Sequence, residues 1–156
     1  MRCPLLAAML LVSAASASAQ GALSSDEALV AYCHGAWSAQ SLAIEQLIEG
    51  ACGPAGTAAE CETVKRELAV RRSQVQRNYE KLNDALYQRG LIGEDGWVGR
   101  RGAEAGSSAR AASRQGASEV LACLRLNLPT MPKSQAPTSD DSCERIWRRC
   151  GPDLTG

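Results

Sequence analysis

Cysteines are the residues in this 156-residue chain whose type and number could do chemistry, and there are seven of them. Exported proteins pair such cysteines in disulfides, whereas a zinc site needs closely spaced cysteines and histidines. The chain has one histidine and no Cys-x-x-Cys pair, so the metal alternative lacks its ligands. We therefore predict no metal site and three disulfides among six cysteines: Cys33, Cys52, Cys61, Cys123, Cys143 and Cys150.

The single histidine, His34, directly follows Cys33. A Cys–His nucleophile pair would need a reduced Cys33, which a disulfide would remove. In a helix, His34 points about 100° away from its neighbour, so we expect a partly exposed histidine with a structural role. The chain also lacks the nucleophile-elbow, Walker and dinucleotide-binding motifs. We predict neither catalytic residues nor a cofactor.

Adjacent carboxylates occur at three places in the chain. Asp26-Glu27 and Asp140-Asp141 fall where helices should begin, and there they favour the helix dipole. Glu94-Asp95 lies in a glycine-rich loop and could bind a cation, but the Asp-x-Asp-x-Asp-Gly spacing of a calcium loop is absent.

The glycine-rich loop from Leu91 to Gly102 holds the best candidates for contact with a partner. These are Trp97, Arg100 and Arg101, because tryptophan and arginine are enriched among the residues that dominate binding energy. The alternative is that Trp97 folds back and covers the end of a helix bundle. Both interpretations stay open from the sequence.

Charge is unevenly distributed, although the formal net charge is zero. Residues 20–62 carry six acids and no Lys or Arg, whereas residues 63–125 carry twelve bases and seven acids. One interpretation is that an acidic helix pairs with a basic one. The other is a basic stripe that binds an anionic component of the cell envelope. Nucleic acid is not an expected partner of a neutral, exported chain.

The N-terminus has the three parts of a secretory signal peptide. One arginine precedes a short apolar run, and Ala17-Ser18-Ala19 forms a small-residue cleavage site. We predict a signal peptide over residues 1–19, and a periplasmic or extracellular mature chain without a transmembrane span. Cleavage near Ala19 would remove the seventh cysteine, Cys3.

Two long helices should follow the signal peptide. A serine at 24 or 25 and the acids after it predict a helix over about 26–50, with apolar residues at steps of three and four. Thr57 and Glu60 have capping-box spacing and predict a second helix over 57–89, ended by Gly90. Its apolar stripe repeats every seven residues, at Cys61, Leu68, Val75 and Leu82. Such a stripe leaves the oligomeric state open, because other helices of the chain can cover it.

Two further helices and a linker complete the prediction. An alanine-rich helix over 103–127 supplies little burial energy in its first half, which leaves the order of residues 99–118 open. A proline-rich linker spans 128–139. Residues 140–156 form a short helix and tail that clasp the helical bundle of residues 20–127.

Helical rise restricts how the cysteines can pair. Cys143 and Cys150 are about 10.5 Å apart along one helix, too far for a bond with each other. The favoured pairing joins Cys52 to Cys61, and joins Cys33 and Cys123 to the two C-terminal cysteines. The register assumes that the third helix packs along the second. Direct bonding of Cys33 to Cys123 is the alternative.

These features predict an all-α fold: a long antiparallel helical hairpin, a third alanine-rich helix and a short C-terminal helix, stapled by disulfides. For function, we expect an exported, non-enzymatic interaction module that binds an unknown protein or an anionic envelope component. The alternatives are a periplasmic chaperone-like stress protein and an enzyme of unknown class.

Overall fold

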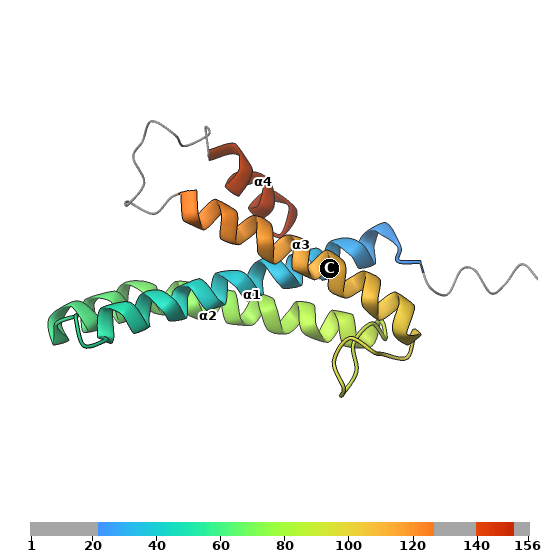
Figure 1. Ribbon diagram of the computed structural model, residues 1–156, viewed down its shortest axis with the longest axis horizontal. Coiled ribbons are helices and arrows are strands. Elements are labelled where there is room, and N and C mark those ends of the chain that lie inside the picture. Colours follow the sequence, from blue (N-terminus) through green and yellow to red (C-terminus); the bar gives the residue numbers. More distant parts are fainter. Residues whose placement is uncertain (1–21, 127–139, 152–156) are drawn as a thin grey trace, which may run out of the picture.

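Four helices form the protein in the computed structural model, which describes residues 22–126 and 140–151 (Figure 1). They are α1 (Ser25–Cys52), α2 (Ala58–Gln88), α3 (Gly102–Leu126) and α4 (Asp140–Arg149). No strand occurs in the described ranges, which confirms the all-α prediction. Helices α1, α2 and α3 begin and end within two residues of the predicted bounds, and α4 begins at the predicted residue 140. The predicted signal peptide, the linker 128–139 and the last five residues lie outside the described residues.

Local sequence signals determine the ends of the two long helices. Ser24 caps α1 and Thr57 caps α2, and each forms a capping box with a glutamate three residues later. These boxes satisfy backbone N–H groups that the first helical turn leaves unpaired. At the other end of α2, Gly90 adopts a φ of 69°, which glycine accepts without steric cost.

Helix α1 is the centre of the fold, with α2 packed on one side and α3 on another. Our expectation that the third helix packs along the second was wrong: α3 packs against α1, and its backbone stays away from α2 throughout the described ranges. In Figure 1, α3 crosses α1 at a steep angle and then diverges from it.

Glycines make this crossing possible. A Cβ on Gly35 of α1 would lie 1.8 Å from the Ser113 carbonyl oxygen of α3. A Cβ on Gly116 would lie 2.0 Å from the Tyr32 carbonyl oxygen. The two backbones therefore touch, and Ala36 of α1 and Ala109 of α3 are fully buried. This contact explains why the alanine-rich helix is continuous from Gly102.

Helix α4 is held against the crossing by two of the three disulfides. Cys33 bonds to Cys150, and Cys123 bonds to Cys143, while Cys52 and Cys61 close the turn between α1 and α2. This arrangement agrees with the pairing that the helical rise favours. The Trp37 indole also donates to the Cys150 carbonyl oxygen at 3.1 Å and lies 4.9 Å from the Trp147 ring. The C-terminal helix is therefore a clasp.

Burial divides the hairpin of α1 and α2 into two regions. We call residues 45–74 the arm, because no side chain in this range is buried, and we call the remaining described residues the body. In the body, Val75, Leu82 and Leu86 of α2 are 3% exposed or less. In the arm, Cys61 and Leu68 continue the same stripe but are only half-buried.

Candidate functional site

The loop between α2 and α3 contains the three residues that the sequence singled out as partner contacts. Trp97 is half-buried and packs against the hydrophobic core. Its ring lies 5.6 Å from the His34 ring in an edge-on arrangement. A Cβ on Gly106 would also lie 1.6 Å from the Trp97 carbonyl oxygen, so the loop lies directly on α3. Trp97 thus anchors the loop to the body.

Arg101 has an intramolecular role as well. It forms an ion pair with Glu27 of α1 and donates a hydrogen bond to the Ala22 carbonyl oxygen at 3.0 Å. The Glu27 side chain is 12% exposed, and it also accepts from the Ser24 backbone N–H. Arg101 therefore ties the loop to the start of α1.

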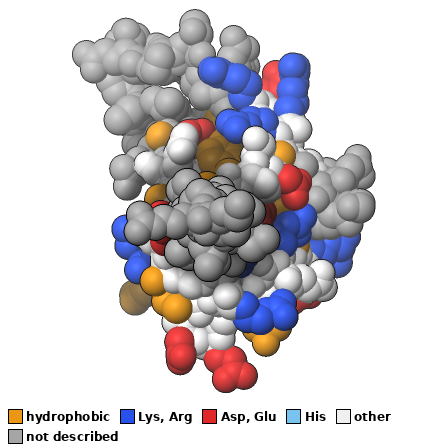
Figure 2. Space-filling model, turned by 90° about the vertical axis from the view of Figure 1, so that its right-hand side faces the viewer, with side chains coloured by type: hydrophobic (Ala, Val, Ile, Leu, Met, Phe, Trp, Pro, Cys, Tyr) orange, Lys and Arg blue, Asp and Glu red, His pale blue; other side chains and the backbone are white. Residues whose placement is uncertain are grey.

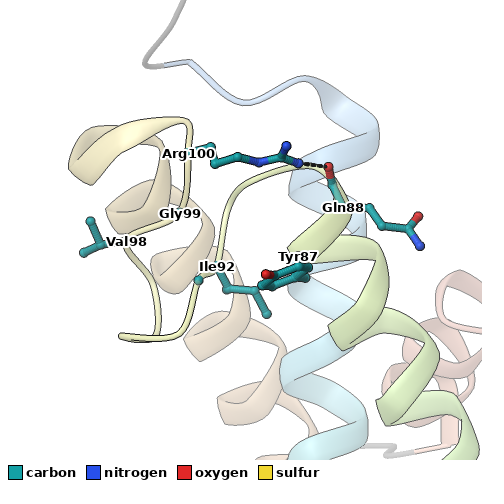
Figure 3. Close-up of a pocket in the computed structure, with 7 residues that line it drawn as sticks. Tyr87, Gln88, Ile92, Val98, Gly99 and Arg100 are labelled. Atoms are coloured by element: carbon teal, nitrogen blue, oxygen red, sulfur yellow. Dashed lines mark hydrogen bonds between the residues drawn. The ribbon is translucent and has the colours of Figure 1, made fainter.

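Arg100 is the exposed member of the three, and it lies at one end of an open groove of about 590 Å³. Its guanidinium donates to the Gln88 carbonyl oxygen at 3.0 Å, which satisfies one of the unpaired carbonyls at the end of α2 (Figure 3). The remaining N–H groups of an arginine fork can bind an acceptor from outside the chain.

Apolar side chains line the rest of the groove. Tyr87 and Ile92 lie together on one side in Figure 3, and Val98 lies across the loop from them. Tyr87 is 55% exposed and Val98 is 58% exposed. The groove also has glycine backbone in its lining. One of these glycines, Gly99, packs so closely that an added Cβ would lie 2.1 Å from the Gly90 carbonyl oxygen. The groove is therefore preformed by tight backbone packing.

Figure 2 views the molecule from the end at which this loop lies. Hydrophobic side chains reach the surface there in small separate areas, and lysine and arginine side chains lie beside them. Acidic side chains gather at the lower edge of this view. Charges of both signs therefore surround the apolar areas on this face.

His34 is 8% exposed, so the expectation of a partly exposed histidine was wrong. The helix turns its side chain away from Cys33, but α2 and α3 both reach that side. Its Nδ1 lies 3.3 Å from Ser113 Oγ, and its ring centre lies 4.8 Å from that of Tyr79. Burial lowers the pKa of His34, and the Asn83 amide offsets only part of this effect. His34 is therefore a neutral link between three helices at neutral pH.

The pairing of Ser113 with His34 is one that a serine nucleophile could use, but the geometry does not favour catalysis. Both residues are 8% exposed, and neither lines the groove next to Arg100. A nucleophile must reach its substrate, and these side chains are enclosed by the helices that they join.

The structure offers no metal centre in the described ranges, where no three potential ligands among His, Cys, Asp and Glu lie together. Within the same residues, every helix is too short or too polar to cross a bilayer.

Comparison with known proteins returned no match at a significant level, neither with a family model, nor with a curated protein, nor with a solved structure. The function is therefore argued from the chain's own residues.

Three large apolar side chains of the groove were not among the sequence candidates: Tyr87, Ile92 and Val98. Tyr87 directly follows Leu86, which is fully buried, and so it points about 100° away from the buried stripe. An aromatic residue off the stripe in the last turn of a helix was the available signal. Ile92 gives no such signal, because its place depends on how the loop folds back.

Proposed function

We propose that this protein is an exported, non-enzymatic binding module that contacts a protein partner through the groove between Tyr87, Val98 and Arg100. Three disulfides support export, because such bonds persist in oxidising compartments. Two of them fasten α4 to α1 and α3.

The observation that carries the proposal is the exposure of Tyr87 and Val98 on either side of a preformed groove. Tyrosine and arginine are both enriched among the residues that dominate binding energy, and tyrosine contributes a large contact area with little loss of side-chain freedom. Here the loop backbone is already fixed by Trp97 and Gly99, so binding would order few additional groups.

The chemistry of the groove defines the partner. An apolar side chain of a partner fits between Tyr87 and Val98, and a carboxylate next to it would accept hydrogen bonds from Arg100. The proposed ligand is therefore a protein segment in which an apolar residue stands beside an acidic one.

The two other functions considered for this chain have less support. An enzyme would need a pocket that converges on reactive side chains, and His34 lies apart from the groove. A chaperone would need a broad exposed apolar patch. The large apolar side chains exposed in the described ranges are few: Leu42, Leu47, Val70, Tyr87 and Val98.

Site-specific photo-cross-linking tests the proposal in the exported protein. A photoreactive residue at Val98 should give a discrete cross-linked product, and adding Tyr87→Ser should reduce it at least tenfold. The same photoreactive residue at Arg77, exposed on α2 away from the groove, is the control. Equal cross-linking at both positions would contradict a binding role for the groove.

Export is tested separately by the intact mass of the secreted protein with and without reduction. We expect a chain that begins at Gln20 and holds three disulfides. An uncleaved N-terminus or free thiols would contradict the proposed compartment, and Cys33 and His34 would then need study as a reactive pair.

A further inference from the structure

The enclosed His34 ring has four neighbours, and one of them belongs to the loop that forms the groove. Ser113 Oγ of α3 lies 3.3 Å from its Nδ1, and the Tyr79 ring of α2 lies 4.8 Å from the imidazole. Helix α2 also contributes the Asn83 amide. The Trp97 ring lies 5.6 Å away and meets the imidazole edge-on. His34 therefore connects the three longest helices directly to the groove loop.

A positive charge at His34 would have little to stabilise it. Tyr79 is the only titratable group among these four neighbours, and tyrosine is neutral between pH 5 and 8. In the part of the chain that the structure describes, no charged side chain contributes to the lowered pKa of His34, which burial causes and the Asn83 amide partly offsets. Protonation also adds a donor, while Nε2 is buried and has no hydrogen-bond partner among the described residues. The charged imidazole therefore needs water, which does not reach the enclosed ring.

Trp97 is the neighbour that can leave the ring with the least loss of structure. Ser113 belongs to the crossing where α1 and α3 touch, and Tyr79 and Asn83 belong to the continuous helix α2. Trp97 lies in a loop, and its side chain is only half-buried. Loops with half-exposed side chains open at a lower free-energy cost than packed helices do. Water can therefore reach the charged imidazole most easily where Trp97 covers it.

Movement of Trp97 would disturb the groove, because the next three residues of the chain line it. Val98, Gly99 and Arg100 follow Trp97 directly, and all three belong to the groove lining. In Figure 3 they lie on the loop, whereas Tyr87 lies on the last turn of α2. If the loop leaves the body, Val98 and Arg100 separate from Tyr87, and the groove is lost.

From this arrangement we propose that His34 is a pH-sensitive switch for the groove. The neutral imidazole holds Trp97 and the loop in place, and protonation in a mildly acidic medium releases the loop and takes the groove apart. The inference rests on the proposed function, to which it adds release of the protein partner in acid. It differs from a general loss of stability, because residues 91–101 should open while the four helices stay folded.

Hydrogen exchange at pH 7.5 and pH 5.5, corrected for the intrinsic effect of pH, tests the release without any partner. The backbone N–H groups of Leu91 and Arg101 donate hydrogen bonds in the native loop, so their exchange reports its opening. We expect peptides from residues 91–101 to lose protection at least tenfold at pH 5.5, and peptides from residues 62–74 of the arm to keep theirs. His34→Gln, which is neutral at both pH values, should remove the loss. No loss in the loop, an equal loss in all peptides, or an unchanged loss in His34→Gln would overturn the proposal.

Proton NMR on the wild-type protein makes the test independent of how the variant folds. The chain has a single histidine, so its imidazole signals belong to His34. We expect the midpoint of the imidazole titration and the midpoint of loop opening, followed at Val98, to coincide. Two clearly separate midpoints would show that another group controls the loop and would overturn the proposal.

Cross-linking from Val98 connects the switch to the partner. The photoreactive residue at Val98 should give at least tenfold less product at pH 5.5 than at pH 7.5, and adding His34→Gln should make the yields equal. Equal yields without His34→Gln would overturn the switch and leave the groove as a binding site. Loop opening in acid without a cross-linked product at either pH would instead contradict the proposed function alone.

Discussion

The body and the arm of the same hairpin share one sequence pattern and differ in burial. Val75 and Leu82 in the body are almost fully buried, while Cys61 and Leu68 in the arm, on the same seven-residue repeat, stay half-exposed. Leu82 belongs to the hydrophobic core to which α1, α3 and α4 also contribute, whereas no residue of the arm belongs to that core. A periodic stripe therefore predicts a helix and the side of it that faces inward. How far the side chains on that side are buried depends on the elements that pack against them.

The largest expected difference in stability between the body and the arm comes from substitutions at two glycines of α1. Gly35→Leu should abolish the native fold, because a Cβ there would overlap the Ser113 backbone of α3. Gly50→Ala in the arm has nothing within 4 Å of the new Cβ and should stabilise the protein by up to about 1 kcal/mol. Urea unfolding followed by circular dichroism measures both. A folded Gly35→Leu variant would show that the helix crossing is loose.

Removal of a disulfide should also destabilise the protein more in the body than in the arm. The bond between Cys33 and Cys150 joins residues 117 apart, and its loss should cost about 5 kcal/mol by the chain-entropy relation. The bond between Cys52 and Cys61 spans nine residues and should contribute about 3 kcal/mol. Paired Cys→Ser variants in urea give the comparison. A larger loss from the arm bond would contradict the clasp role of α4.

Removing an ion pair should give a smaller difference in stability between the body and the arm. Arg101→Gln should cost about 2 kcal/mol, because it leaves the largely enclosed Glu27 carboxylate without its cation. Arg72→Gln in the arm should cost less than about 0.5 kcal/mol, since both partners of that pair are at least 40% exposed and screened by water. If Arg101→Gln lowered partner binding at unchanged unfolding free energy, Arg101 would belong to the groove.

The smallest contrast is in the response to acid. His34 in the body has a lowered pKa in the folded state, so the unfolded chain binds the proton more readily. Stability from this residue is present above the ordinary pKa near 6.5 and decreases as the pH falls below it, by at most about 1.4 kcal/mol per pH unit. Ser113, Tyr79, Trp97 and Asn83 face the ring, and none of them is an acid that would favour the cation.

Urea unfolding at pH 7.5 and pH 5.0 measures this effect, with His34→Gln as the comparison. We expect the wild-type loss between the two pH values to exceed that of the variant. The opposite order would mean that the folded state stabilises the charged imidazole.

The elements of the fold could be predicted because their signals are local. Capping serine and threonine, the glutamate three residues later, Gly90 and the apolar steps all act within one or two turns of the helix. The disulfide pairing was also within reach, since helical rise alone prevents a bond between Cys143 and Cys150.

The candidate site was only partly predictable. The sequence drew attention to the loop and to Arg100, but its strongest candidate, Trp97, packs against the core. Tyr87 and Val98 form the groove only because Gly90 and Gly99 let the loop fold back onto the end of α2. Such backbone contacts join residues that have no periodic relation in the sequence.

By itself, then, the sequence determined where the four helices begin and end and that Cys143 and Cys150 need two separate partners. The tertiary structure decided that α3 crosses α1 instead of lying along α2, because Gly35 and Gly116 let those two backbones touch. It also decided that His34 is enclosed and that the arm is left with two helices. The physical reason is that helix formation depends on near neighbours along the chain, whereas burial depends on which distant surfaces fit closely enough to exclude water.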